Sequence, residues 1–399
     1  MTAPESLTDM VWANAERFGG SIGVRRRTGG SWLDVTTREF AGEVLDVAKG
    51  LIAAGLRPGE RIALYASTRY EWTLFDFAAW TAGCQTVPID PGAPVEDVEW
   101  ILSDSGACAV VLETAAHRET LRRIVDRLPE LGWVWQLDGS TDGAGGDESD
   151  GDIVPAVAEL TELGAELDDA VVHERRRAVA ADEVATLVYP PGGPLTGPPK
   201  RVELTHGEVL AEVRAAITAY SPLVRAGNSL LVLLPLADLG ARLLSLACVY
   251  TRTTLGHVPD AADLSTDLGT FRPRTIVASA ALLRDVLAAA RDKAATEGRS
   301  AVFDVAAGVA VRYGARTRPS LALRLQHAVA DTVVYPKLRA AFGGRCVAAI
   351  TSGEPLEPAL ARFYRGIGIA VRGTRGPDRA PDVTIRAAPL SRGRPPGRE

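Results

Sequence analysis

Short apolar runs alternate with segments of helical periodicity through the first half of the chain. Arg61–Ala66, Gln85–Pro88 and Ala107–Leu112 are apolar runs of the length of a strand. Between them, Glu71–Trp80 and Val95–Leu102 place apolar residues at helical spacing. Apolar strands separated by helices of this length favour a parallel sheet that helices cover on both faces. We therefore expect an α/β fold.

A further helix is expected ahead of the first strand, with Thr36 or Thr37 as its N-cap. Its apolar residues recur at helical spacing, at Phe40, Val44, Val47, Ala48 and Leu51. Gly55 ends this helix, and Pro58-Gly59 turns the chain into the strand.

A second alternating region begins at Glu183. It holds four more strand candidates, at Ala185–Tyr189, Leu230–Leu234, Thr275–Ala278 and Cys346–Thr351. Helical stretches lie between them, notably Ala280–Ala295 and Tyr335–Phe342. From Arg372 to Glu399 the sequence is dense in Arg, Pro and Gly, so we expect a loosely ordered tail with one short strand around Val383–Arg386.

Composition and charge narrow the class of protein. With 46% hydrophobic and 24% charged residues among 399, the chain has the composition of a globular protein. The formal net charge of −6 gives no basis for a nucleic-acid partner, because that affinity rests on Lys and Arg that neutralise phosphates. No apolar run approaches the roughly 20 residues of a membrane span, and the polar N-terminus does not resemble a signal peptide. We therefore predict a cytoplasmic protein.

Neither the cysteines nor the most acidic stretch of the chain indicates a metal site. The four cysteines lie far apart in apolar stretches, so we expect reduced core thiols at Cys84, Cys108, Cys248 and Cys346. Residues 138–152, DGSTDGAGGDESDGD, match the opening of an EF-hand loop. Ser149 stands where that loop needs a bidentate Glu, so we expect a solvated acidic loop.

The segment from Tyr189 to His206, YPPGGPLTGPPKRVELTH, is the strongest candidate for chemistry. A Gly-rich loop after a strand presents backbone N–H groups and hydroxyls to a polyphosphate, and a Lys adds positive charge. This segment offers the candidates Gly192, Gly193, Thr196, Gly197 and Lys200. Its prolines remove backbone donors, so the segment by itself is either a degenerate phosphate loop or a Pro/Gly-rich connection.

The motif TGPPK at 196–200, followed by VELTH at 202–206, resembles the second half of the signature loop of the AMP-forming adenylating superfamily. Further segments resemble its long-chain fatty acyl-CoA ligase branch. They are RYEWTLFDFA at 69–78, VPID at 87–90, VEWILSDSGA at 98–107, LLPLADLGAR at 233–242, LACVYTRTTLGH at 246–257 and VYPKLRAAFGG at 334–344. The resemblance extends from about Leu7 to Val371.

This resemblance implies the fold of the family's N-terminal domain over residues 1–371. Two αβα-layered subdomains, roughly 1–180 and 181–371, and a partial small β-barrel are expected, with a divergent tail at 372–399. The resemblance also implies ATP and Mg²⁺ as cofactors and a fatty acid that is converted to acyl-AMP and then to acyl-CoA. The family's nucleotide site falls on the phosphate-loop residues above together with Ser352, Gly353 and Glu354, and its acyl site falls on Asp238.

The chain departs from the family pattern at several of these positions. PPGGPL at 190–195 replaces the hydroxyl-rich front of the phosphate loop, and Arg201 stands in place of a Gly. Asp238 replaces the His of a PLAH-type motif, where a carboxylate repels both the fatty acid and the α-phosphate. Alternatively, Asp238 is simply the N-cap of a helix over Gly240–Val249.

Three further segments are also candidates for the nucleotide site. In the adenine motif near Gly373 the stacking Tyr is absent, and only Asp378 remains as a candidate metal ligand. The turn TSGEPL at 351–356 either contacts a ribose or adenine or is a strand-to-helix turn with Glu354 in the first helical turn. Thr205-His206 is likewise either part of the site or a helix start.

Compared with the family, the C-terminal domain that carries a catalytic lysine is missing, so CoA binding is not expected. We therefore expect a catalytically impaired homologue of long-chain fatty acyl-CoA ligases, a pseudoenzyme. One alternative is an acyl-activating ligase completed in trans by a separate C-terminal-domain protein. Another is a non-catalytic module that binds a fatty acid, an acyl-adenylate or a partner protein.

Overall fold

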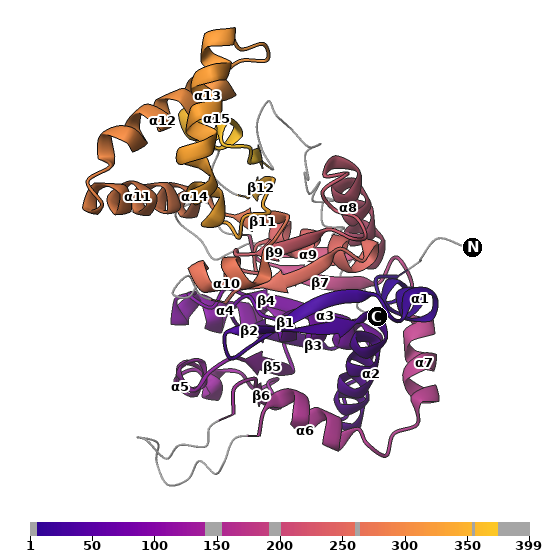
Figure 1. Ribbon diagram of the computed structural model, residues 1–399. Helices are drawn as coiled ribbons and strands as arrows, with labels where there is room; N and C mark the ends of the chain where they lie inside the picture. The colour runs from indigo at the N-terminus through magenta and orange to yellow at the C-terminus, as the bar shows by residue number, and fades with distance from the viewer. Residues whose placement is uncertain (1–5, 140–153, 191–200, 260–263, 353–355, 374–399) are drawn as a thin grey trace, which may run out of the picture.

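The computed structural model describes residues 6–139, 154–190, 201–259, 264–352 and 356–373 (Figure 1). In this part of the chain two sheets hold all the strands. The larger has the order β13-β12-β11-β9-β10-β1-β2 and the smaller β6-β5-β3-β4-β7-β8. Neighbouring strands are parallel except in the pairs β1–β2 and β7–β8.

The strands of the larger sheet are β1 (Ile22–Thr28), β2 (Ser31–Thr36), β9 (Ser229–Val232), β10 (Thr254–His257), β11 (Thr275–Ala278), β12 (Ala348–Thr351) and β13 (Ala370–Gly373). Those of the smaller sheet are β3 (Arg61–Tyr65), β4 (Gln85–Ile89), β5 (Ala109–Leu112), β6 (Trp133–Gln136), β7 (Val184–Val188) and β8 (Val202–Thr205). Each of the seven strands predicted before residue 372 is therefore confirmed, as β3, β4, β5, β7, β9, β11 and β12.

Helices surround and separate the sheets. In chain order they are α1 (Asp9–Phe18), α2 (Thr37–Ala53), α3 (Tyr70–Thr81), α4 (Val95–Ser105), α5 (Ala115–Arg122), α6 (Ala156–Leu163), α7 (Asp169–Ala178), α8 (His206–Ala219), α9 (Leu239–Thr251), α10 (Leu264–Phe271), α11 (Ala280–Thr296), α12 (Ser300–Gly314), α13 (Leu321–Val333), α14 (Tyr335–Ala340) and α15 (Pro358–Gly366). Thr36 caps α2 with a capping box, which decides between the two predicted caps. No helix in the described ranges is both long and apolar enough to cross a membrane.

Alternate residues of the central strands face different cores, because successive side chains of a strand point to opposite faces. In β3, Ile62 and Leu64 pack into the core between the sheets, whereas Ala63 and Tyr65 pack beneath α4 and α5. In the larger sheet, Leu231 packs with residues of α10 to α15, and α11–α15 stand together beyond that sheet in Figure 1. The molecule is thus built of helix, sheet, helix, sheet and helix layers, as expected for strands buried on both faces.

The middle helix layer holds a buried ion pair. Arg242 of α9 donates from Nε to Asp76 of α3 at 2.9 Å, and its Nη2 donates to the other carboxylate oxygen. The same guanidinium donates to the hydroxyls of Thr86 at 2.6 Å and Thr186 at 2.8 Å, which belong to the smaller sheet. Both charged side chains are almost fully buried. This network joins α9 to α3 and to two strands.

One expectation differs from the observed arrangement, and another is not tested by it. The partial β-barrel has no counterpart among the described strands, because the β1–β2 hairpin extends the larger sheet instead of closing a third one. The sheets also exchange segments across the predicted boundary near residue 180, since β1 and β2 join the larger sheet and β7 and β8 join the smaller. The subdomain boundary itself stays a prediction.

The cysteines are free thiols. Cys84, Cys248 and Cys346 are buried, which confirms the prediction of core residues for these three, and Cys108 is half-buried. Burial raises the pKa of the Cys84 and Cys346 thiols to about 12, so neither is a thiolate near neutral pH.

Candidate functional site

The carboxyl ends of the parallel strands in the larger sheet form one edge, and ligands of open α/β sheets bind at such edges. The chain leaves β9 into Leu233–Asp238, β11 into Ser279, and β12 into Ser352. Two of the predicted site residues, Asp238 and Ser352, therefore lie at this edge. The edge is the candidate site.

Asp238 is the N-cap of α9. Its backbone is extended, with φ −69° and ψ 117°, and its Oδ1 accepts a hydrogen bond from the Ala241 amide at 2.9 Å. A side-chain oxygen that accepts from the first turn satisfies one of the amides that a helix start leaves unpaired. The capping prediction is therefore confirmed, and the helix begins at Leu239, one residue before the expected start.

Ser352 lies against the second oxygen of the same carboxylate. Its hydroxyl donates to Asp238 Oδ2 at 3.2 Å, which links the end of β12 to the loop after β9. A Cβ on Gly240 would lie 3.1 Å from Ser352 Oγ and 3.2 Å from Asp238 Oδ1. Glycine at 240 thus leaves room for this contact, which local sequence pattern does not reveal because the partners are 114 positions apart.

The remaining predicted site residues lie outside the described residues. They are Gly192, Gly193, Thr196, Gly197, Lys200, Gly353, Glu354 and Asp378. What the structure does describe is the two ends of the 191–200 segment, which connects the antiparallel pair β7–β8 with Val188 opposite Val202. The predicted short strand at 383–386 and the body of the acidic loop from residue 140 also lie outside the described part.

Both flanks of the 191–200 segment are attached to α4. The Tyr189 hydroxyl donates to Asp104 Oδ2 at 2.7 Å, and Arg201 Nη1 donates to the Asp104 carbonyl at 3.0 Å. Arg201 also lies 3.4 Å from the Glu203 carboxylate. Arg201 is therefore occupied with surface anchoring contacts, which the sequence motif did not predict.

Thr205 and His206 are structural. Thr205 caps α8 in a reciprocal capping box with Glu208, so its interpretation as a helix start is confirmed. His206 is buried, and its Nδ1 accepts from the Leu7 amide at 3.4 Å. Burial lowers the pKa of His206 to about 4, which keeps the ring neutral near pH 7.

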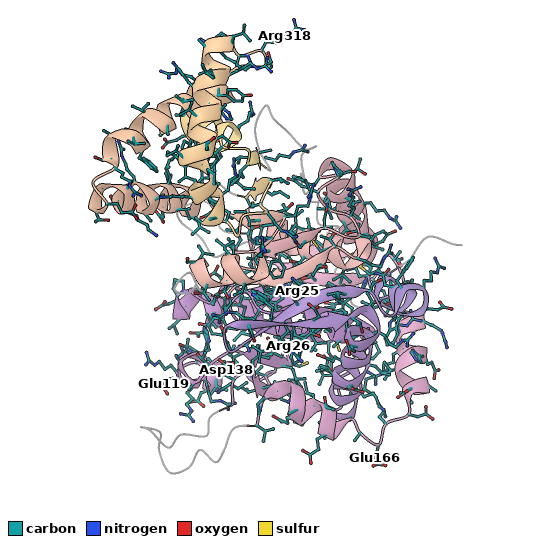
Figure 2. All side chains as sticks on the ribbon, in the orientation of Figure 1. Arg25, Arg26, Glu119, Asp138, Glu166 and Arg318 are labelled. Carbon is teal, nitrogen blue, oxygen red and sulfur yellow. The ribbon has the colours of Figure 1, made fainter. Side chains whose placement is uncertain are left out.

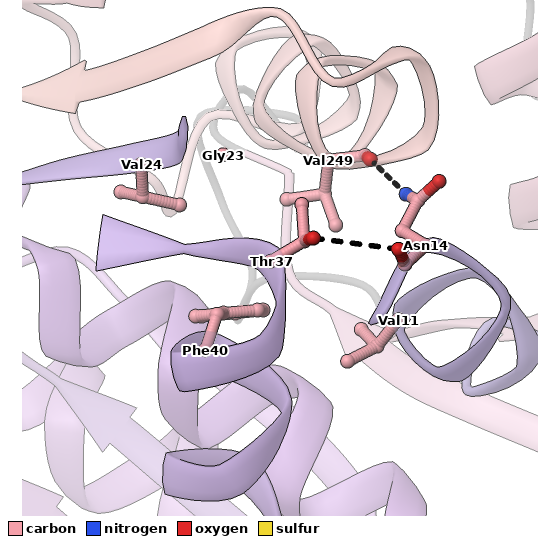
Figure 3. A pocket seen from close by; sticks show the side chains of 7 residues that line it. All are labelled: Val11, Asn14, Gly23, Val24, Thr37, Phe40 and Val249. Carbon is pink, nitrogen blue, oxygen red and sulfur yellow. Dashed lines mark hydrogen bonds between the residues drawn. The ribbon is translucent and has the colours of Figure 1, made fainter. Parts of the chain in front are cut away.

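A hollow of about 260 Å³ opens at the same sheet edge. Its exposed lining is polar and apolar in about equal parts, and the lining residues are Leu233, Val258, Pro259, Leu264, Ser279, Ala281, Leu282 and Asp285. A second recess, where α1, β1, α2 and α9 meet, is shown in Figure 3 and measures only about 10 Å³. Asn14 closes it by donating to the Val249 carbonyl at 2.7 Å, so it is a packing gap of about the size of one water.

Among the described residues at the edge, Asp238 and Ser352 do not hold a phosphate by themselves. No group of three or more His, Cys, Asp or Glu in the described ranges is arranged to hold a metal ion. Asp238 presents only acceptors, and the hydroxyl hydrogen of Ser352 is directed to Asp238. An anionic phosphate needs donors, so these two residues do not form a phosphate site by themselves.

Comparison with known proteins places this site in context. A model of the AMP-binding enzyme family matches residues 11–376. Long-chain-fatty-acid–CoA ligase FadD15 of Mycobacterium bovis and its counterpart in Mycobacterium tuberculosis are each 37% identical over 370 residues. These matches cover 92% of this chain and 59% of the relatives, so the chain spans about three fifths of their length.

Solved structures agree on the fold. The N-terminal domain of FACL13 from Mycobacterium tuberculosis superimposes with a TM-score of 0.62 at 19% identity, covering 93% of this chain and 75% of that one. The A-PCP didomain of a carboxylic acid reductase from Segniliparus rugosus, in complex with AMP, gives a TM-score of 0.68 at 16% identity and covers 93% and 52%. The predicted α/β fold of an acyl-CoA ligase N-terminal domain is confirmed. The chain belongs to the AMP-binding enzyme family, as a homologue of the long-chain fatty acid–CoA ligases over their N-terminal domain.

Proposed function

We propose that this chain is an acyl-activating domain of the fatty acid–CoA ligase type whose own capacity to form an acyl-adenylate is low. The observation that carries the proposal is the Asp238 carboxylate, which is fixed at the sheet edge by the Ala241 amide and the Ser352 hydroxyl. The relatives' reaction joins two anions, a fatty acid and ATP. A fixed negative charge at their meeting point opposes that reaction.

The size of this effect follows from the environment of Asp238. Two unit charges 4 Å apart interact with about 4 kcal/mol at an effective dielectric constant of about 20, and with about 1 kcal/mol in water. Asp238 is half-buried, so the repulsion lies between these limits. We therefore expect a penalty of roughly tenfold in the affinity for an acyl-adenylate.

The sequence of the phosphate-loop segment supports the same proposal. Five prolines in 190–200 remove backbone donors, and the hydroxyl and the cation in this stretch are Thr196 and Lys200. Loss of one positioned donor to a developing charge costs about 10²–10³ in rate. Weak adenylation is the combined expectation from these two features.

A second candidate function is acyl binding without turnover. The hollow of about 260 Å³ beside the edge supports it, because the aliphatic side chains of Leu233, Val258 and Leu282 line part of it and can contact an acyl chain. The other alternative is an acyl-activating ligase that a separate C-terminal-domain protein completes in trans. It predicts that adding the isolated C-terminal domain of a FadD15-type relative raises pyrophosphate release by this chain.

Calorimetric titration with ATP·Mg²⁺ and with a long-chain acyl-sulfamoyl adenosine tests the proposal. We expect weak binding of the adenylate mimic to the parent and about tenfold tighter binding to Asp238→Asn, since asparagine keeps the cap but removes the charge. Asp238→His is the family-like variant and should bind at least as tightly as Asp238→Asn. Pyrophosphate release by the parent at ordinary enzyme rates, about 1–10³ s⁻¹, would show the proposal to be wrong.

A further inference from the structure

Helix α13 carries a continuous stripe of exposed aliphatic side chains. Leu321, Leu325, Val329 and Val333 recur every four residues and are 81%, 70%, 61% and 56% exposed. Residues four apart lie on the same side of a helix, so these four form one row, here called the α13 stripe. Leu323 and Ala330, at other positions around the helix, are buried. The helix therefore has an apolar face that packs inward and a second one that faces outward.

The stripe lies on a projecting part of the molecule. α12, α13 and the turn between them stand at the end farthest from the smaller sheet in Figure 1, and Arg318 marks that tip in Figure 2. α12, which packs against α13, adds the exposed residues Val302 and Val305.

The surroundings of the stripe are strongly basic. Residues 299–345 hold eight basic side chains against two acidic ones, a formal charge of +6 in a chain whose net charge is −6. Both acids are already neutralised, Asp304 by Arg291 at 2.7 Å and Asp331 by Arg339 at 2.6 Å. Within the described part of the chain, no ion pair is formed by the exposed Arg316, Arg318 and Arg324. Positive charge thus surrounds the start of the stripe.

We propose that the α13 stripe docks on an anionic lipid surface, with α13 lying along the membrane plane. Amphipathic helices bind such surfaces by burying an aliphatic face at the headgroup boundary while basic side chains bind anionic headgroups. A second copy of this chain is a poorer partner, because it brings the same positive charge to the contact. The segment 374–399 is also net basic, which disfavours it as the cover. The proposal is independent of catalysis at the sheet edge.

Vesicle co-sedimentation of the full chain tests this docking. We expect binding to vesicles that contain phosphatidylglycerol, weaker binding at high ionic strength, and little binding to pure phosphatidylcholine. The double variant Leu325→Asp/Val329→Asp should bind the anionic vesicles at least about tenfold more weakly, because it removes aliphatic area and adds two negative charges. Absence of parental binding to anionic vesicles at low ionic strength would overturn the proposal.

A matched control separates the stripe from the added charge. Leu33→Asp/Leu163→Asp introduces the same two charges at exposed apolar positions on β2 and α6, which are 52% and 44% exposed in the parent. We expect this control to bind vesicles within about threefold of the parent, since it keeps the stripe and shifts only the net charge. Equal weakening in both double variants would contradict the assignment to α13.

A third variant tests directly whether the α13 stripe contacts the lipid, and this test does not depend on the folding of the aspartate variants. Leu325→Trp puts an indole on the stripe, and brominated phosphatidylglycerol should quench the added fluorescence relative to the parent. Lack of extra quenching would overturn the proposal. Concentration-dependent dimerisation of the parent that Leu325→Asp/Val329→Asp abolishes would do the same, in favour of a second copy.

Discussion

Two carboxylates of this molecule lie in opposite environments. One is in the helix layer between the two sheets, and the other is at the carboxyl edge of the larger sheet. Asp76 in the layer is almost fully buried and is matched by a bidentate arginine and its two threonine partners. Asp238 at the edge is half-exposed and is held by one amide and one hydroxyl. The first carboxylate requires a charged partner, whereas solvent shields the second.

This difference predicts how strongly each position constrains the stability of the fold. An unpaired charge in the helix layer costs several kcal/mol, which is a large part of the stability of a typical domain. At the edge, a substitution of Asp238 that keeps a capping side chain should cost little stability, because the residue acts there as the N-cap of α9. The stability of the fold therefore depends more on the buried pair than on the carboxylate at the edge.

The largest expected effect comes from breaking the buried pair. Arg242→Met leaves Asp76 buried without a charged partner and should lower the free energy of unfolding by about 3–5 kcal/mol. The double variant Asp76→Leu/Arg242→Met should recover most of that loss, because no unpaired charge remains. Urea unfolding measures the free energy of unfolding of both variants. If Arg242→Met were within about 1 kcal/mol of the parent, the helix layer would be no less tolerant of a lost partner than the sheet edge.

Packing in the same part of the molecule gives the next largest effect. A Cβ on Gly50 of α2 would collide with the Leu160 backbone of α6, so Gly50→Ala should cost about 1–3 kcal/mol. Gly42, on the same helix, has open space around its missing Cβ, so Gly42→Ala should stabilise the protein by about 0.5–1 kcal/mol. If thermal unfolding shows that Gly50→Ala is less stable and Gly42→Ala more stable than the parent, the contact with α6 and not helix propensity decides the outcome at Gly50.

A pH dependence follows from His257, at the end of β10. Its Nε2 lies 3.1 Å from Thr73 Oγ1, and burial lowers its pKa to about 3. The unfolded chain, with a histidine pKa of about 6.5, binds the proton first, so stability falls as the pH drops from about 6.5 towards 3. This residue alone should lower the free energy of unfolding by up to about 2 kcal/mol between neutral pH and pH 5.

His257→Asn isolates that contribution. His206, whose pKa is lowered to about 4, acts in the same direction and remains in the variant. The difference in unfolding free energy between parent and variant should therefore be constant above about pH 7.5 and should shrink as the pH falls to 5. Parallel pH profiles of the two proteins would show that His257 does not remain neutral in the fold.

The smallest effect is expected at the edge itself. Asp238→Ala removes the cap of α9 and should cost about 1 kcal/mol, whereas Asp238→Asn keeps the cap and should stay within a few tenths of the parent. Thermal unfolding separates these values. A cost for Asp238→Asn as large as that for Arg242→Met would mean that the edge is as intolerant as the helix layer.

Much of the fold was predictable because local pattern encodes it. The apolar run Thr275–Ala278 became β11 with the predicted bounds, since a fully buried strand is a continuous apolar run. β1 and β2 escaped prediction because Ile22–Thr28 holds three consecutive arginines. Arg25 lies 2.6 Å from Asp34 on β2, and Arg27 lies 2.8 Å from Asp267 on α10. Those partners, which hold the charged strand in a sheet, are set by tertiary packing.

The sequence by itself indicated three helix starts, because a cap and its first turn lie within four residues. Thr36, Thr205 and Asp238 could each be proposed as a cap from neighbouring residues, and each is one. Only the tertiary structure decided what else these residues touch. Asp238 meets Ser352 across 114 positions and Asp76 meets Arg242 across 166, because the order of the parallel strands brings them together. Local periodicity carries no information on that order, which long-range burial selects.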